Sequence, residues 1–231
     1  MQLTTHKRLV LVSALAFMLV AAMVATLQRM PLSVSTAVWR EAPYTFIIDA
    51  GHGGVDGGAV SPTGLFESHL NLQIAIQLES LLNFYGYNAI MTRRSDISIH
   101  DNDARTIRQK KMSDLRNRAE LVNNTPNALL VSIHQNTFGQ TQYRGLQVFH
   151  ANGAADLGKV LQATITTALA PDNTRPTKPV PNSVFLFGAI NAPALLIECG
   201  FLSNPQDEKL LANPVYQRKL AACIFAALTM N

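Results

Sequence analysis

Apolar positions along the chain fall into two patterns, short continuous runs and longer stretches with a helical period. The run YTFIID at residues 44–49 is typical of a buried strand, whereas residues 67–85 place apolar side chains three or four positions apart and precede Gly86. That period is typical of a helix with one buried face, and glycine commonly ends a helix. The folded part of the chain is therefore predicted to begin as strand, loop and helix.

The same alternation continues to the C-terminus. Further strands are predicted at 87–92, 127–134, 145–150 and 192–199, and further helices at 114–124 and 155–169. Two last helices are predicted because Asn204 and Asn213 each precede a proline, which puts a capping side chain before a residue suited to the first helical position. Alternating strands and helices predict an α/β domain, with a mostly parallel central sheet and helices on both of its faces.

One uncharged apolar stretch, residues 9–27, precedes this domain and follows the basic pair Lys7 and Arg8. It is long enough to span a bilayer as a helix, and it is longer than the apolar core of most cleaved signal peptides. We expect residues 1–30 to form an N-terminal membrane anchor, with a cleaved signal segment, and hence a secreted protein, as the alternative. Basic residues before the span place the remainder of the chain outside the cytoplasm.

Composition sets limits on the rest of the chain. Residues 31–42 are predicted to be a linker and residues 43–231 a single folded domain. The formal net charge of +4 is mild, so nucleic acid is not expected as a partner. The two cysteines, Cys199 and Cys223, have no C-x-x-C spacing, which indicates neither a disulfide framework nor a thiolate zinc site and leaves a single disulfide open.

Three predicted strands deliver a metal-binding or titratable side chain at the same end. His52, His134 and Glu198 lie at or just after the ends of the runs TFIIDAGH, LLVSIH and ALLIEC. Ligands of open α/β sheets sit at the carboxyl edge of the strands, so we expect these side chains to lie close together. Two histidines and one carboxylate would meet the need of a catalytic zinc ion for three protein ligands and one open position.

On residue type alone, three acids are candidates for the third ligand. Glu67 is preferred because it opens the first helix beside the same edge, although an acid there also suits a capping turn. Asp49 and Asp56 are the rivals. We expect Asp49 to orient His52 by a hydrogen bond, and Asp56 to serve the backbone of a glycine turn.

The glycine-rich stretch GHGGVDGG at residues 51–58 does not follow either common nucleotide-binding order. We expect its glycines to let the backbone fold closely around His52 and to leave room for metal and substrate. The basic segment 93–118 is predicted to be either a solvated face or a contact for substrate carboxylates, and Arg118 within it either packs against the sheet or binds substrate.

Four motifs together resemble a known family. They are IIDAGHGGVDGGAV at 47–60, Glu67, SIHQN at 132–136 and IECGFLSNPQDEKLL at 197–211. In this order they resemble the zinc-dependent N-acetylmuramoyl-L-alanine amidases of bacterial cell walls, from about residue 44 to the C-terminus. The stretches IRQKKMSDLRNRAELVNN (107–124) and KPVPNSVFLF (178–187) further resemble the germination-specific spore cortex branch, which also carries an N-terminal membrane segment.

The resemblance implies an activity and roles for four residues. His52, Glu67 and His134 would bind Zn²⁺, and Glu198 would be the catalytic carboxylate for cleavage of the amide between N-acetylmuramic acid and L-alanine in peptidoglycan. It also implies a role in spore cortex maturation through muramic-lactam formation, with an activating protein or a cortex-modifying deacetylase as partner. The alternatives are a membrane-tethered peptidoglycan-binding or regulatory protein without catalysis, and a zinc exopeptidase, which commonly needs more acids for two metals.

Overall fold

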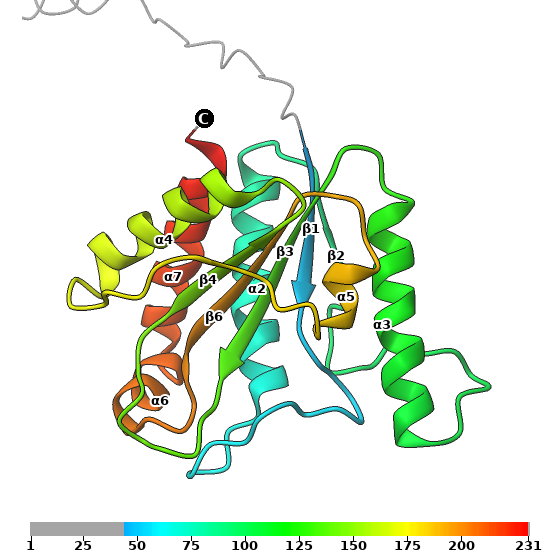
Figure 1. Cartoon of the computed structure of the whole chain (residues 1–231), viewed down its shortest axis with the longest axis horizontal. Helices are drawn as coiled ribbons and strands as arrows, with labels where there is room; N and C mark the ends of the chain where they lie inside the picture. Colours follow the sequence, from blue (N-terminus) through cyan, green and yellow to red (C-terminus); the bar gives the residue numbers. More distant parts are fainter. Residues whose placement is uncertain (1–43, 231) are drawn as a thin grey trace, which may run out of the picture. The chain divides into compact units, whose positions relative to one another are not determined.

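The computed structural model describes residues 44–230, so the predicted anchor and linker lie outside the described residues. Within that range no helix is both long enough and apolar enough to cross a membrane. The described chain forms one six-stranded sheet with helices on both faces (Figure 1).

The strands are β1 (Thr45–Ala50), β2 (Ala89–Met91), β3 (Ala128–Asn136), β4 (Gln147–Ala151), β5 (Lys178–Pro179) and β6 (Ala194–Phe201). Their spatial order is β2-β1-β3-β6-β4-β5. Four of the five neighbouring pairs are parallel, whereas β4 runs antiparallel to β6. Only residues 137–146, without a helix, join β3 to β4, and a parallel return usually needs a longer helical crossover. The predicted mostly parallel sheet is thus a mixed one.

The helices are α2 (Glu67–Phe84), α3 (Ile107–Asn123), α4 (Ala155–Leu169), α5 (Phe185–Gly188), α6 (Pro205–Leu211) and α7 (Pro214–Thr229). Helices α2, α4 and α7 cover one face of the sheet, and α3 and α5 cover the other (Figure 1). Ile48 and Val131 face the first layer, while Ile47 and Leu130 face the second, and all four are fully buried. Burial on both faces explains why these strands are continuous apolar runs.

Most element boundaries agree with the sequence prediction, and two caps are confirmed directly. The Asn204 side chain accepts hydrogen bonds from the backbone at the start of α6, and Asn213 does the same for α7. Helix α3 begins at Ile107, earlier than predicted, because Thr106 and Gln109 form a capping box there. The prediction placed the start later because the first turns of this helix are polar. The short elements β5 and α5 were not predicted.

The topology brings three strand ends to one edge. β1, β3 and β6 are parallel neighbours, and the arrowheads of β1 and β3 point to the lower edge of the sheet in Figure 1. The backbone amide of Glu67, at the start of α2, is hydrogen-bonded to the Ala59 carbonyl, which fixes α2 against the loop that follows β1. This edge is where the predicted site residues meet.

Candidate metal centre and active site

The structure brings the three predicted metal ligands together. One ligand atom from each of His52, Glu67 and His134 lies within 4.8 Å of the other two. Glu67 Oε1 is 3.2 Å from His52 Nε2 and 2.9 Å from His134 Nδ1. The predicted proximity is confirmed, and it joins the end of β1, the first turn of α2 and β3.

The donor set suits a zinc ion. Two imidazoles and one carboxylate are the protein ligands of a common class of catalytic zinc site, in which a fourth position stays open. Zinc–ligand bonds of about 2.0–2.1 Å in a tetrahedron separate the ligand atoms by about 3.3 Å. The separations between Glu67 Oε1 and the two histidine nitrogens are close to that value. Zinc binding itself stays a prediction.

Two glycines of the 51–58 loop make room for these ligands. A Cβ atom on Gly51 would lie 2.2 Å from His134 Nε2, and one on Gly58 would lie 2.6 Å from Glu67 Oε2. His52 between them has φ 61°, a left-handed conformation that non-glycine residues adopt mainly where surrounding structure enforces it. The expected close folding of the loop around His52 is therefore confirmed.

Glu67 is a buried and firmly held carboxylate. Its Oε2 accepts a hydrogen bond from Ala59 N (2.8 Å), and its Oε1 accepts one from Gln135 N (3.0 Å). These donors lie outside α2, so Glu67 does not cap its own helix. Burial acts to raise the pKa of Glu67, but the hydrogen bonds with His134 and His52 hold it well below its usual range. The side chain is therefore ionised and faces the two imidazoles.

The residue that orients His52 is Asp56, so the expectation for Asp49 was wrong. Asp56 Oδ2 lies 3.0 Å from His52 Nδ1, and Asp56 Oδ1 lies 2.8 Å from Lys111 Nζ. The left-handed turn at His52 folds the chain back, with a bridge between Gly53 and Asp56, so that a carboxylate four residues later reaches the ring. A carboxylate hydrogen-bonded to Nδ1 fixes the orientation of the ring and leaves Nε2 as the nitrogen that can bind a metal.

This pairing also changes the protonation of His52. Burial lowers its pKa, but hydrogen bonds to Asp56 and Glu67 outweigh this effect and raise the pKa to about 9. Because a metal ligand must be the neutral imidazole, metal binding near neutral pH would release a proton from this ring.

Asp49 instead anchors Arg118 beneath the site. Asp49 Oδ1 accepts a hydrogen bond from Arg118 Nη1 (2.5 Å), and Asp49 Oδ2 accepts one from Ser132 Oγ (2.6 Å). Arg118 Nη2 in turn donates to the backbone oxygen of His52 (2.7 Å). Both members of the ion pair are at most 2% exposed. Arg118 is therefore a positioning residue for the His52 loop and does not bind substrate.

Two more arginines of the basic segment are also engaged within the fold. Arg93 is 2% exposed and donates to the backbone oxygens of Ala50, Gly51 and Ser68. Arg94 forms an ion pair with Glu79. Of the two alternatives predicted for this segment, Arg94 agrees with the solvated face, whereas Arg93 is buried and fits neither.

Glu198 lies beside the metal-ligand cluster on the neighbouring strand. It is directly opposite His134 in the parallel register of β3 and β6. Its Oε2 atom is buried and has no hydrogen-bond partner among residues 44–230. Burial raises the pKa of Glu198, an effect that His134 opposes and Glu67 reinforces. A buried carboxylate oxygen without a partner is unfavourable in a purely structural role and is typical of a functional group.

Cys199 lies next to Glu198 but packs into the apolar core between the sheet and α2, α4 and α7. It is buried, and burial raises the pKa of its thiol well above the usual range. Cys199 and Cys223 are both free, so the disulfide that the sequence left open is absent from the described residues. Nothing in this environment activates Cys199 as a nucleophile.

Comparisons with known proteins agree with this site. The family model Amidase_3, described as N-acetylmuramoyl-L-alanine amidase, matches residues 46–230. The chain is 34% identical over 184 residues to a germination-specific N-acetylmuramoyl-L-alanine amidase of Bacillus subtilis (strain 168). The aligned region covers 78% of this chain and 76% of the relative.

Two solved structures extend the comparison. The CwlD amidase of Clostridioides difficile, determined in complex with the GerS lipoprotein, superposes with a TM-score of 0.77 and 36% identity and covers 81% of this chain and 97% of that one. An N-acetylmuramoyl-L-alanine amidase of Clostridium difficile 630 superposes with a TM-score of 0.70 and 32% identity, and the match covers 81% of this chain and 95% of that one. The chain therefore belongs to the N-acetylmuramoyl-L-alanine amidase family.

Proposed function

We propose that the protein is a zinc-dependent N-acetylmuramoyl-L-alanine amidase (EC 3.5.1.28), which hydrolyses the amide between N-acetylmuramic acid and L-alanine of peptidoglycan stem peptides. The observation that carries the proposal is the convergence of His52, Glu67 and His134 beside the buried Glu198 carboxylate. Family membership supports the reaction class, and the donor set supports the metal.

Each side chain has a defined task in this proposal. Zinc held by the three ligands would polarise the substrate carbonyl and lower the pKa of a bound water. Glu198 accepts a proton from the attacking water and passes it to the departing alanine nitrogen, a task that the raised pKa of its carboxyl favours. Asp56 holds the His52 ring, and Arg118 holds the backbone that carries it.

The proposal is tested with the full chain in detergent, by zinc analysis and by hydrolysis of a muramoyl-L-alanyl peptide. We expect one zinc per chain and release of a peptide with a free N-terminal alanine. A purified protein that binds peptidoglycan but releases no peptide from it, even after zinc is added, would favour the binding or regulatory alternative. Cleavage between amino acids of the stem would favour an exopeptidase.

The proposed biological setting is spore cortex maturation. The likeness to a relative named as germination-specific supports this setting. Removal of the stem peptide leaves a lactyl carboxyl on muramic acid, and closure of that carboxyl to a muramic lactam requires a free amine on the same sugar. The proposal therefore includes a deacetylase partner that frees this amine. Mass spectrometry of peptidoglycan with and without the protein tests it, and unchanged lactam content would contradict it.

The proposal also places the catalytic domain outside the cytoplasm, tethered by residues 9–27. The length and the uncharged composition of this segment support the tether. An activating protein partner is the last element of the proposal, and the complex of the CwlD amidase with a lipoprotein supports it. Co-purification of the tagged full chain from membranes, followed by addition of the recovered protein to the amidase assay, tests whether such a partner raises turnover.

A further inference from the structure

One arginine near the site is held in place but has no acidic partner. The guanidinium carbon of Arg175 lies 4.8 Å from the centroid of the Phe201 ring, and its Nε donates to the backbone oxygen of Arg144 (3.1 Å). Within residues 44–230, neither terminal nitrogen of Arg175 has a hydrogen-bond acceptor, and no carboxylate lies within 4 Å. The two outer donors of a fixed cation are therefore free.

This arrangement differs from that of three arginines in the 93–118 segment, and from that of Arg144, which donates to the neutral side-chain oxygen of Gln206 (2.6 Å). Arg93 donates to backbone oxygens, and Arg94 and Arg118 are paired with acids. A guanidinium stacked on an aromatic ring keeps its donors in one plane, which suits two parallel hydrogen bonds to a carboxylate. The surroundings of Arg175 are therefore those of a binding group rather than of a structural ion pair.

The strand register places the Phe201 ring on the catalytic side of the sheet. His134 pairs with Glu198, and after an irregularity in the ladder Asn136 pairs with Phe201. Paired residues on neighbouring strands face the same side, and Asn136 shares the side of His134 because it lies two positions later. Phe201, and with it the guanidinium of Arg175, therefore lies on the same side as His134 and Glu198.

A partly buried hydrogen bond joins the Arg175 segment to a position opposite Glu198. Gln147 is the antiparallel partner of Glu198, and its Nε2 donates to the backbone oxygen of Pro176 (2.9 Å). Gln147 is 4% exposed, whereas Pro176 is exposed, so the bond is partly buried. The residue after Arg175 is thus fixed next to the strand position that faces the proposed general base.

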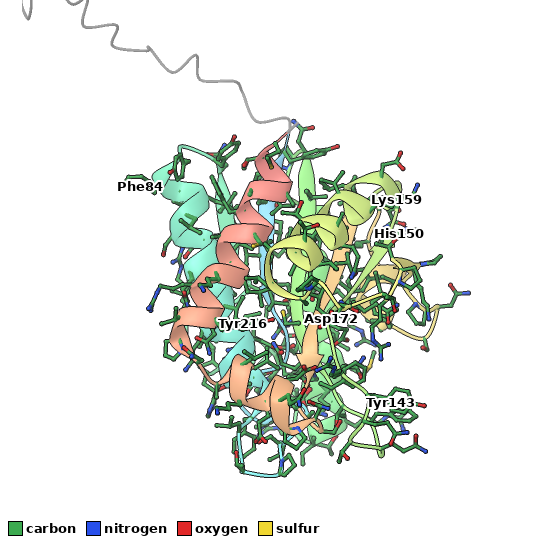
Figure 2. The ribbon with its side chains drawn as sticks, turned by 90° about the vertical axis from the view of Figure 1, so that its left-hand side faces the viewer. Phe84, Tyr143, His150, Lys159, Asp172 and Tyr216 are labelled. Carbon is green, nitrogen blue, oxygen red and sulfur yellow. The ribbon has the colours of Figure 1, made fainter. Side chains whose placement is uncertain are left out.

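Two exposed aromatic rings extend the surface beside this cation. The Tyr143 centroid lies 6.5 Å from that of Phe201, and the Phe138 centroid lies 4.8 Å from that of Tyr143. Phe138 is 53% exposed and Tyr143 39% exposed, and Tyr143 projects outward at the lower right of Figure 2. The result is an open apolar wall next to a fixed positive charge, which suits an extended peptide with an acidic group.

A separate cavity is lined in part by Tyr143, Asp172 and Tyr216, which are labelled in Figure 2. Tyr143 and Arg175 also border this cavity of about 430 Å³, but so do Asp172 and Asp207. Arg144 and Arg175 balance these two acids, so the cavity as a whole has no excess positive charge to attract an anion. Asp207 also accepts a hydrogen bond from Phe201 N (2.9 Å), but no carboxylate in the described part of the chain lies within 4 Å of the Arg175 guanidinium, so its outer nitrogens are the better place.

We propose that Arg175, stacked on Phe201, binds a carboxylate of the substrate's stem peptide and so selects acidic stems over amidated ones. The inference rests on the proposed amidase function and adds a specificity residue to it. The carboxylate belongs either to the residue that follows L-alanine or to the end of the stem, because both groups carry the same chemistry.

Three muramoyl-L-alanyl peptides of equal length distinguish these sources. One has both carboxylates free, the second has only the group next to alanine amidated, and the third has only the terminal group amidated. For Arg175→Gln we expect kcat/KM on the fully acidic peptide to fall about tenfold or more, mainly through KM, because a charge-assisted hydrogen bond is lost. The peptide that lacks the recognised carboxylate should be cleaved equally by variant and parent enzyme.

Two further variants control this comparison. Arg175→Lys keeps the charge but loses the planar stack, so we expect an intermediate loss confined to the same peptides. Arg218→Gln removes an exposed arginine of α7 and should change none of the three rates. If Arg175→Gln lowers the melting temperature, the Arg175→Lys enzyme is used for the same comparison.

The outcomes separate this inference from the proposed function. A parent enzyme that cleaves none of the three peptides would contradict the amidase function itself. A parent enzyme that cleaves all of them, with Arg175 variants that lose the same factor on each peptide or on none, would leave the amidase function intact and overturn the role of Arg175.

Discussion

Exchanging Asp56 for Asn tests which acid supports the metal ligand His52. Asp56 Oδ2 lies 3.0 Å from His52 Nδ1, and the amide keeps the shape of the side chain but removes its charge. Loss of such a carboxylate behind a histidine ligand typically lowers metal affinity about 10- to 100-fold, or about 1.4–2.7 kcal/mol of binding free energy. The ion pair of Asp56 with Lys111 is partly exposed, so its loss should change stability little.

Asp49→Asn is the matched comparison because it makes the same chemical change three residues before His52. Asp49 is 1% exposed and pairs with Arg118, and breaking a buried ion pair costs about 3–5 kcal/mol. Arg118 keeps its bond to Asp114, so we expect the lower end of this range in the free energy of unfolding. Zinc affinity should fall less than in Asp56→Asn, because Asp49 acts on His52 only through Arg118, which keeps its bond to Asp114.

The pKa of Asp49 adds a pH signature to this difference. Burial acts to raise that pKa, but the charge of Arg118, together with His134 and the hydrogen bond from Ser132, outweighs burial and lowers the pKa from 3.8 to about 2. A carboxyl with a depressed pKa stabilises the fold fully above its unfolded value, near pH 4, and loses this contribution as pH falls through 2. The parent protein should therefore lose about 2 kcal/mol more than Asp49→Asn across this window.

Two assays separate the roles of these acids. Zinc dissociation constants are measured by competition with a chelator at pH 9.5, where protonation of His52 competes less with zinc. Unfolding by urea is measured without metal. The reasoning would be refuted by a zinc affinity that falls in Asp49→Asn and stays unchanged in Asp56→Asn.

Three other predictions concern the ligands, the cysteine and the tether. Alanine at His52, Glu67 or His134 should remove bound zinc and activity together. Full zinc occupancy with turnover in any one of these variants would show that another side chain binds the metal. Cys199→Ala should retain activity in the peptide-release assay, and an inactive but folded variant would reveal a role for the thiol. The intact chain should fractionate with membranes, and removal of residues 1–42 should leave a soluble, active domain. A mature N-terminus beyond the apolar segment would show that this segment is a cleaved signal peptide instead.

The sequence was sufficient for most of the fold because the central strands are buried on both faces. The first six residues of β3, ALLVSI, contain one polar residue, and the asparagine–proline pairs before α6 and α7 mark helix starts by local chemistry. The first turns of α3 carry no apolar period, so only its capping box indicated the true start at Ile107. The direction of β4 depends on how the chain returns after β3, which periodicity does not encode.

The metal-ligand cluster could be predicted because parallel strands end at one edge, whatever their exact packing. The roles of Asp49 and Asp56 could not, because they depend on the left-handed conformation of His52, which reverses the chain direction. A histidine followed four residues later by an acid in a glycine turn was the available signal. Arg118 contacts His52 from a helix far away in sequence, so only the folded arrangement reveals that contact.

In the proposed mechanism zinc binding and proton transfer fall to different residues of one site, and the Glu198→Gln variant distinguishes the two tasks. Zinc content and peptide release are measured on the same preparation of this variant and of the parent enzyme. We expect unchanged zinc content and a rate lowered by about a hundredfold to ten-thousandfold, because the amide cannot accept the water proton. Hydrolysis at a near-normal rate would contradict the role of Glu198 as the base, and loss of zinc would make Glu198 a metal ligand.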